Sequence, residues 1–392
     1  MIDTIVLTLD DNSFRIVAHD RFSPSTEVLY SLKNLTKLNI LGGRSNIKCV
    51  QNPTTTELRA GKYKPRLTVT KRIGRNRQYQ IALRVEFSIP KLLYGNNFDE
   101  LEDEDFSLVI SKLKQSLRDM GVIVSEPVLV NAPVSAIHFS KNIPLVDYTT
   151  PYTYLERLSR INLNQRLDLN QTDFRNEGHS LKFRANSFEV AFYDKMKDLD
   201  KVKISEKRAE ENENASQIKL FEKLEISKPF EVLRMEVRLN RRQKLRQVLT
   251  KVGIEIEPTV HALFRREIAQ KVLLYYMSEI ERSYPPILLY DYKDAKTFLS
   301  NLLISNGKTG KTGLRKALQM LGARVIIEEV GIREFREITK KHGRANWYRF
   351  NKEMVTMGGV PEQQPFATIR QCLKEFKPLK LIDFQNKQCT IE

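Results

Sequence analysis

A tyrosine and a lysine lie close together at the end of a strand-like run, SFEVAFYDK, as Tyr193 and Lys195. Side chains alternate between the two faces of a strand, so these two are expected on one side, with Phe192 on the other. A tyrosine hydroxyl, with a pKa of about 10, is a poor nucleophile until its proton is removed or its anion is stabilised. A lysine beside it would favour the tyrosinate, or the charge that grows on an attacked phosphate.

Three other strand-like segments also have one polar face. The apolar residues of IALRVEFSI, VSAIHFS and LRMEVRLN alternate with Glu86, His138 and Glu236, respectively. If these strands share a sheet with Tyr193, the four side chains can converge on one surface. Arg-x-Glu occurs twice at the same spacing, as Arg84-Glu86 and Arg234-Glu236. The alternative is that each polar face is simply the solvent side of a half-exposed antiparallel strand.

The composition indicates an anionic partner. The chain has 392 residues, with 65 Lys and Arg against 48 Asp and Glu, and a net charge of +17. Such a balance is typical of proteins that bind nucleic acid and less often of proteins that bind anionic membranes. No apolar run approaches the roughly 18 residues that a membrane span needs, so no membrane partner is expected.

The first residues of the sequence and the number of cysteines predict a cytoplasmic protein. The start, MIDTIVLTLDD, has acidic residues where a secretion signal has basic ones. Cys49, Cys372 and Cys389 are too few and too scattered for a zinc site or a disulfide framework. A reducing compartment is therefore expected.

The order of strand-like and helical patterns along the sequence predicts an α+β fold in two domains. Alternating runs with short turns indicate strands in the first part, including a hairpin over Arg66–Ile89. A charged, helix-prone insertion is predicted at about 196–229, and a helix with its apolar residues at every fourth position begins at Pro258-Thr259. We therefore expect an antiparallel sheet domain over 1–254 and a helical domain over 255–392.

The helical domain has two features that suit DNA. An apolar stripe from Leu314 to Leu321 is followed by Gly322 and a second helical pattern, Ile327–Lys341, which is compatible with a helix-turn-helix. Many helical bundles share that pattern. The run REFREITKKHGRANWYR is basic with aromatic residues, as expected for backbone contact and for stacking on unpaired bases.

Basic residues also cluster in the sheet domain, on the hairpin and around RLNRRQKLR. We expect their contacts with phosphates to dominate affinity for DNA. The predicted DNA-binding residues are Lys71, Arg72, Arg75, Arg77, Arg234, Arg238, Arg241, Arg242, Lys244 and Arg246.

The order of several segments resembles rolling-circle replication initiators, both the filamentous-phage strand-nicking replication protein and the plasmid initiators with a Tyr-(Asn/Asp)-Lys motif. The segments are MIDTIVLTL, RVEFSIPKLLYGNNFDEL, SFEVAFYDK, LRMEVRLN and RANWYRFNKEMVTMGGVP, so the resemblance covers most of the chain. It implies that Tyr193 is the nicking tyrosine, Lys195 its companion, and Glu86 and Glu236 the acidic positions. One departure is His138, in Ala136-Ile137-His138, where the family usually has Arg-x-Asp. His138 would then replace a carboxylate ligand, unless the strand register differs.

The resemblance implies a sheet core of the His-hydrophobic-His (HUH) endonuclease type in a diverged form. It also implies a metal-dependent single-strand DNA endonuclease that forms a 5′-phosphotyrosyl link and starts rolling-circle replication of a phage or plasmid. Glu86, His138 and Glu236 would hold Mg²⁺ or Mn²⁺, which polarises the scissile phosphate. The implied partners are origin DNA, single-stranded or locally melted, and a host helicase and polymerase. The alternatives are a relaxase or single-strand transposase, and a non-catalytic DNA-binding initiator or repressor.

Overall fold

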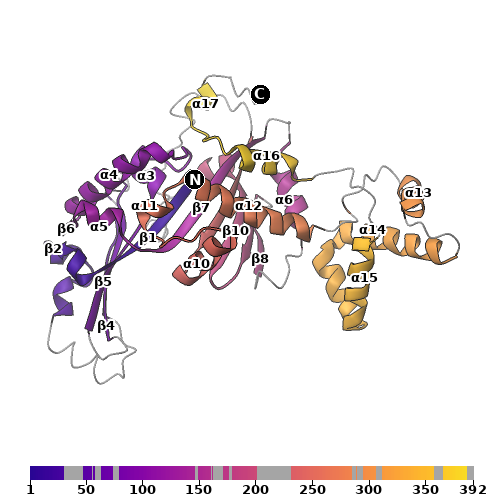
Figure 1. Ribbon diagram of the computed structural model, residues 1–392, viewed down its shortest axis with the longest axis horizontal. Helices are drawn as coiled ribbons and strands as arrows, with labels where there is room; N and C mark the ends of the chain where they lie inside the picture. Colours follow the sequence, from indigo (N-terminus) through magenta and orange to yellow (C-terminus); the bar gives the residue numbers. More distant parts are fainter. Residues whose placement is uncertain are drawn as a thin grey trace.

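One antiparallel sheet forms the centre of the molecule (Figure 1). The computed structural model describes residues 1–30, 47–54, 56–57, 63–73, 79–145, 149–159, 161, 171–175, 179–200, 231–284, 288, 295–305, 311–356 and 365–385. Within these residues, nine strands pair in the order β3-β4-β5-β1-β7-β11-β10-β9-β8. Every pairing is antiparallel. The coarse prediction of an α+β protein built on an antiparallel sheet is confirmed.

The strands of this sheet range from short to long. Their bounds are β1 Ile2–Asp10, β3 Ile47–Gln51, β4 Arg66–Ile73, β5 Tyr79–Ser88, β7 Val134–Leu145, β8 Gln171–Arg175, β9 Ser180–Arg184, β10 Phe188–Asp194 and β11 Glu231–Leu239. A separate pair joins β2, Arg15–Ile16, to β6, Val122–Ile123. The predicted hairpin is β4 and β5, and its turn at 74–78 lies outside the described residues.

The alternation in the sequence divides the sheet into an apolar and a polar face. Apolar residues such as Leu7, Phe139, Phe192 and Met235 are fully buried and belong to one hydrophobic cluster. The residues between them lie on the other face, where the pairing places Arg234 opposite Tyr193 and Glu236 opposite Ala191. The four strands that were expected to share a sheet therefore do so.

Helices pack against the sheet through this hydrophobic cluster. They are α3 Ile89–Tyr94, α4 Phe106–Asp119, α5 Glu126–Val130, α6 Pro151–Ser159, α10 Arg242–Lys251, α11 Val260–Leu263, α12 Arg266–Ser283 and α16 Ala367–Glu375. Helix α7, Lys195–Asp200, contacts β10 and β11, and α17, Ile382–Gln385, lies near the C-terminus. The long helix α12 contacts β7 and β11 and buries Tyr276 against Phe188, with ring centroids 5.5 Å apart. Apart from α7, the predicted charged insertion lies outside the described residues.

The helix predicted to begin at Pro258-Thr259 is two helices. Thr259 does cap the first, α11, because its hydroxyl accepts a hydrogen bond from the Ala262 amide at 3.3 Å. The chain leaves the helical conformation at Phe264 and Arg265, and α12 begins at Arg266. The fourfold apolar spacing continues across the break, which is why the sequence pattern alone did not show it.

The sequence predicts a domain boundary after residue 254, but helices that follow this residue pack into the same hydrophobic core as the sheet. Helices α12 and α16 belong to the C-terminal part of the chain, yet both pack against β7. The helices that stand apart from the sheet are α13 Ala295–Ser305, α14 Lys311–Lys341 and α15 Arg344–Thr356 (Figure 1). They contact one another, and Phe335 packs on Trp347 and Phe350 with ring centroids 6.5 and 5.2 Å away.

The helix-turn-helix interpretation of residues 314–341 is wrong. Helix α14 runs without interruption from Lys311 to Lys341, through Gly322. On both sides of Gly322, α14 buries the apolar residues Ala317, Met320, Ala323 and Ile327, whereas Leu314 and Leu318 are about half exposed. A glycine inside a helix costs stability but does not by itself create a turn. The turn comes at Gly343, whose φ is +126°.

A continuous α14 predicts that Gly322→Ala stabilises the protein. A Cβ added at Gly322 meets no atom within 4 Å, and alanine has a higher helix propensity than glycine by about 1 kcal/mol. Denaturant unfolding followed by circular dichroism should show that gain. Gly95→Ala is the matched control, because Gly95 has a φ of +75° and alanine there should cost about 1 kcal/mol. A loss of stability in Gly322→Ala would indicate a turn at this position.

Candidate functional site

The Tyr193 side chain lies on the polar face of the sheet, at the end of β10. It is partly buried, and its hydroxyl donates a hydrogen bond to Glu236 Oε2 at 3.3 Å. Burial raises the pKa of this hydroxyl well above its usual value of 10; Arg234 opposes the shift and the Glu236 carboxylate adds to it. In this state the tyrosine is a neutral donor rather than a tyrosinate.

Glu236 is the acceptor, and its side chain is only 2 % exposed. Arg238 binds it through two hydrogen bonds, from Nε to Oε1 at 2.9 Å and from Nη2 to Oε2 at 3.0 Å. Burial alone would raise the pKa of the carboxyl, but the Arg238 guanidinium holds it well below its usual range. Glu236 is therefore an ionised carboxylate at neutral pH.

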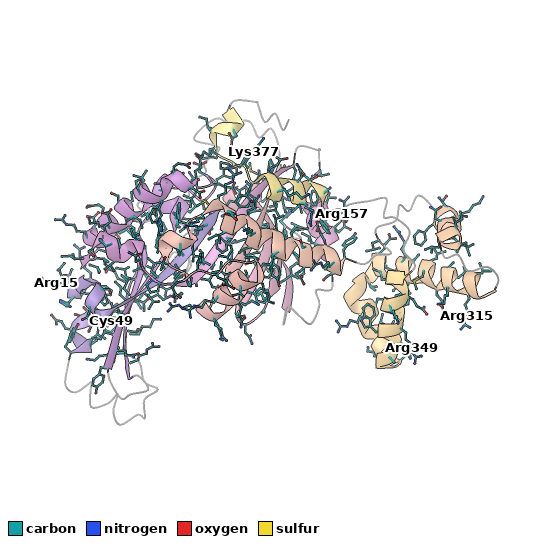
Figure 2. The ribbon with its side chains drawn as sticks, in the orientation of Figure 1. Arg15, Cys49, Arg157, Arg315, Arg349 and Lys377 are labelled. Carbon is teal, nitrogen blue, oxygen red and sulfur yellow. The ribbon has the colours of Figure 1, made fainter. Side chains whose placement is uncertain are left out.

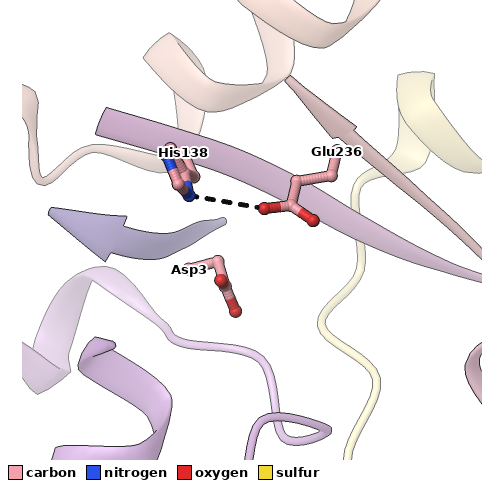
Figure 3. A group of neighbouring side chains, drawn as sticks. All are labelled: Asp3, His138 and Glu236. Carbon is pink, nitrogen blue, oxygen red and sulfur yellow. Dashed lines mark ion pairs between the residues drawn. The ribbon is translucent and has the colours of Figure 1, made fainter. Parts of the chain in front are cut away.

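His138 and Asp3 join Glu236 in a group that can hold a metal ion (Figure 3). Each residue offers one ligand atom, and these atoms lie within 4.8 Å of one another. Nδ1 of His138 is 3.5 Å from Glu236 Oε1, and burial lowers the pKa of the imidazole, which favours its neutral, metal-binding form. Among the residues that the structure describes, these three are the His, Cys, Asp or Glu side chains that lie close enough together, as a group of at least three, to hold a metal ion.

Asp3 was not predicted as a site residue. Simple alternation along β1 places it on the same face as Ile5 and Leu7, which are buried in the core. The pairing with β7 shifts between Ile2 and Thr4, so that a bulge brings Asp3 to the polar face. The signal in the sequence is an aspartate at a position that alternation assigns to the apolar face of β1, with Ile5, Leu7 and Leu9.

Arg234 holds this arrangement together from inside the protein. Its side chain is buried and donates four hydrogen bonds, to Asn97 O at 2.8 Å, Asn142 Oδ1 at 3.2 Å, Asp3 Oδ1 at 2.6 Å and Ser140 Oγ at 2.9 Å. The sequence predicts that Arg234 contacts DNA, and its burial rules out that contact in this arrangement. Because its guanidinium is enclosed and bound to protein acceptors, its role here is to position Asp3 and the loop that carries Asn97.

Lys195 is near Tyr193 but points into the protein. It is the first residue of α7 rather than the end of the strand, and its side chain is fully buried. The ammonium donates to Asn97 Oδ1 at 2.8 Å and to Asp198 Oδ2 at 3.0 Å, and lies 5.8 Å from the centre of the Tyr193 ring. Lys195 is therefore close to Tyr193, as the sequence predicts, but its charge is buried rather than exposed.

Glu86 does not join the three-residue group. It lies on the polar face of β5, opposite Val6 of β1, whereas His138 lies opposite Thr4. Its carboxylate is paired with Arg84 at 3.0 Å. The predicted ligand set of Glu86, His138 and Glu236 thus becomes Asp3, His138 and Glu236.

The predicted DNA-binding residues on the hairpin differ in their surroundings. Arg72 is exposed, whereas Lys71 is buried, with Nζ donating to Leu29 O at 2.5 Å. Arg75 and Arg77 lie outside the described residues.

The predicted residues around α10 also differ. Arg241 is exposed, and Arg242 and Arg246 are exposed but share Glu257 as an ion-pair partner, at 2.5 and 2.7 Å. Lys244 lies over the Phe188 ring, 4.3 Å from its centroid. Arg238 is bound to Glu236 and Glu189. Among the predicted residues that the structure describes, Arg241 and Arg72 are exposed and accessible to a phosphate.

Comparison of this chain with protein-family models, with curated proteins and with solved structures gave no match. The resemblance to replication initiators therefore stays a prediction. None of the helices in the described part of the chain has the length and apolar character required to span a bilayer.

The burial of Lys195 predicts a specific dependence of stability on pH. Burial lowers the pKa of its ammonium to about 8 from a usual 10.5, although Asp198 opposes the shift. Between these pH values the unfolded chain binds a proton that the folded chain does not, so the free energy of unfolding rises with pH in that window. Lys195→Met lacks this contribution. The free energy of unfolding of the wild type, relative to that variant, should rise by about 3 kcal/mol across the window, and a flat difference would contradict the buried ammonium.

Proposed function

We propose that this protein is a metal-dependent tyrosine endonuclease that nicks one DNA strand and so initiates rolling-circle replication of a phage or plasmid. The observation that carries the proposal is the hydrogen bond from the Tyr193 hydroxyl to Glu236, a member of the Asp3-His138-Glu236 group. A nucleophile, an ionised carboxylate and a metal-capable group thus meet on one sheet face. The net charge of +17 supports an anionic substrate such as DNA.

The reaction conserves phosphodiester bonds. Attack by the Tyr193 oxygen forms a bond to phosphorus and breaks the bond from phosphorus to the 3′ oxygen, which leaves as a hydroxyl after taking a proton. The 5′ phosphate of the downstream fragment stays linked to the tyrosine, and the upstream fragment keeps a free 3′-OH that can prime synthesis. Because one phosphodiester replaces another, the step needs no nucleoside triphosphate.

Glu236 orients Tyr193 rather than acting as a strong base. Its low pKa keeps it ionised and makes it a poor proton acceptor, and two of its hydrogen bonds come from Arg238. It can nevertheless direct the hydroxyl, because the O–H points at Oε2. Because the pKa of the tyrosine is raised, a cation close to its hydroxyl must lower that pKa before attack.

The donor set of the three-residue group fits a divalent ion. Two carboxylates and a neutral imidazole suit Mn²⁺ and Mg²⁺. Asp3 and Glu236 already form ion pairs with Arg234 and Arg238, so an ion must share these carboxylates with two guanidinium groups. Asp3, His138 and Glu236 would hold the ion, and the bound ion would polarise the scissile phosphate.

Exposed arginines give the DNA places to bind. Arg72 on β4 and Arg241 beside α10 are exposed in the sheet domain. Arg315 and Arg349 extend from α14 and α15, the helices that stand apart from the sheet (Figure 2). Exposed cations thus lie both on the sheet domain and on α14 and α15. This distribution fits a DNA substrate that extends beyond the two nucleotides at the scissile bond.

Tyr193→Phe tests the nucleophile. The variant loses only a hydroxyl, so binding of a single-stranded origin oligonucleotide should stay within about twofold of wild type. Cleavage and the covalent adduct should vanish, which gel electrophoresis and mass spectrometry of the protein would show. Tyr154→Phe on α6 is a matched control and should cleave normally. Adduct formation by Tyr193→Phe would move the nucleophile to another residue, and absence of an adduct in the wild type as well would favour a DNA-binding protein without nicking activity.

The metal group is tested by Asp3→Asn and His138→Ala against Glu86→Gln. The first two should weaken Mn²⁺ binding, measured by calorimetric titration without DNA, by about tenfold or more, because each removes a ligand atom. Nicking at limiting Mn²⁺ should fall with it. Glu86→Gln should bind the ion as wild type does. The opposite result, with Glu86→Gln weakened and Asp3→Asn unchanged, would restore the ligand set expected from the sequence.

A further inference from the structure

Helix α14 has exposed apolar side chains on the side that it does not bury. It packs on α13 and α15, and it buries Ala317, Met320 and Ile327. Its strongly exposed large hydrophobic residues are Leu314, Leu318, Val325, Ile326, Val330 and Ile338. Apolar side chains that gather on one helix indicate a contact surface, whereas exposed apolar residues scattered singly over a protein need no explanation.

Four of these side chains form one row along α14. Leu314, Leu318, Ile326 and Val330 recur at every fourth position, and Gly322 occupies the central position. Residues four apart are neighbours on a helix surface and together form a ridge. The four side chains are 47, 49, 40 and 43 % exposed, respectively. The row is thus an exposed apolar ridge with a gap at its middle.

A groove lies beside this ridge. Its first part is a shallow hollow of about 460 Å³, lined by Leu314, Leu318, Arg315 and Gln319. These are two members of the ridge and the residue that follows each of them, so the hollow lies between neighbouring rows. Insertion of such a ridge into such a groove is the commonest way in which two helices pack. Helix α14 therefore offers both parts of a helix contact.

The ridge is symmetric about Gly322. In an antiparallel pair of α14 helices that cross there, residues equally far from Gly322 on either side face each other across a two-fold axis. Leu318 of one copy then meets Ile326 of the other, and Leu314 meets Val330. Gly322 meets itself, and a Cβ added to it in one copy contacts nothing within 4 Å, so the two backbones can approach closely.

Charges on the same face select the antiparallel direction. Arg315 lies seven residues before Gly322 and Glu329 seven residues after it, and both are exposed (Figure 2 labels Arg315). Seven residues are close to two helical turns, so both side chains are on the side of Gly322. In the antiparallel pair each Arg315 faces a Glu329, whereas a parallel pair would place like charges together.

These features favour a second copy of this chain as the occupant. Self-complementarity in both apolar residues and charges is required only when the partner presents the same face. A helix that lies on an anionic membrane has cations along its polar border, whereas Glu329 is part of this face. The apolar ridge also has no counterpart on the phosphate backbone of DNA.

We infer that two copies of the protein associate through antiparallel α14 helices that cross at Gly322. The inference does not rest on the proposed function. In a dimer of this kind Arg315 is engaged by the partner helix, and Arg349 on α15 stays accessible to DNA.

The contact is small, so the dimer should be reversible. From Leu314 to Val330 the helix is roughly 24 Å long and about 10 Å wide, which gives on the order of 500 Å² for the two copies. Stable interfaces bury roughly 1,200–2,000 Å². We therefore expect a dissociation constant on the order of 100 µM.

Charge reversal tests the partner and the direction together. Arg315→Glu and Glu329→Arg each place like charges together twice in the dimer. In sedimentation velocity at low salt, between roughly 5 and 500 µM, each variant alone should associate about tenfold more weakly than wild type. An equimolar mixture of the two should recover association, because every Glu then faces an Arg. The variant with both reversals should associate as wild type does.

Leu318→Glu tests the apolar ridge. It would bury two carboxylates in the dimer and should leave a monomer over the same concentrations. Leu108→Glu on α4 is the matched control, because both leucines are 49 % exposed, and it should associate as wild type does. Circular dichroism of both variants should match wild type, since glutamate is a good helix former.

Gly322→Cys tests the crossing point. The two introduced thiols would face each other across the two-fold axis, so mild oxidation should produce a covalent dimer on a non-reducing gel. Arg349→Cys, exposed on α15, should give no more covalent dimer than wild type, whose own cysteines set the background.

Three results would overturn the inference. A wild type that stays monomeric, with no covalent dimer from Gly322→Cys, would show that α14 does not pair with itself. Association that persists in Leu318→Glu, or a mixture of the charge variants that associates no better than each alone, would place the contact elsewhere. A monomer that binds phosphatidylserine vesicles, and loses that binding in Leu318→Glu, would assign the face to a membrane surface.

Discussion

The buried guanidinium of Arg234 is the constraint on which the site depends. An ionised group removed from water is costly unless its donors are satisfied, and breaking a buried pair by removing one partner costs roughly 3–5 kcal/mol. The two terminal nitrogens of Arg234 meet this requirement with acceptors from three places, namely Asp3 on β1, Ser140 and Asn142 on β7, and the main chain of Asn97, whereas its buried Nε has no hydrogen-bond partner. The central strands and the loop after α3 are therefore held in one arrangement. Asn97 also accepts from Lys195, which extends the same network to the start of α7.

This network leaves the polar face of the sheet nearly balanced in charge around Tyr193. Asp3 and Glu236 are negative, Arg234 and Arg238 are positive, and burial favours neutral His138. The tyrosine in this setting stays protonated chiefly because burial raises its pKa. The balance of charge also means that substrate or metal changes the local field substantially when it arrives, because the surroundings have low exposure and screen charge weakly. In the proposed function, activation of Tyr193 would thus be coupled to binding.

The arrangement of strands separates the chemistry from the predicted contacts with the DNA strand. β1 lies between the β4–β5 hairpin and the strands β7, β11 and β10 that carry His138, Glu236 and Tyr193. Arg72, which is exposed on β4, therefore lies on one side of β1 and Tyr193 on the other. The helices α13, α14 and α15 form a further basic unit beside the sheet (Figure 1). A strand bound to more than one of these parts would be held in a defined direction relative to Tyr193.

The sequence by itself determined those features that depend on local pattern. Alternation identified the polar faces of β5, β7, β10 and β11, and the order of charged and apolar segments predicted an antiparallel sheet followed by helices. It also indicated Tyr193, Glu236 and His138 as residues of one surface.

The tertiary structure alone decided what depends on pairing between distant segments. The bulge that turns Asp3 toward Arg234 arises where β1 pairs with β7, more than a hundred residues away, and no local pattern specifies it. The burial of Arg234, Lys195 and Lys71 likewise depends on which elements cover them, since the local sequence around a basic residue is the same whether water or protein lies above it. Helix α14 passes through Gly322 because the buried residues on both sides of it follow one helical stripe, and packing outweighs the weak preference of a single glycine.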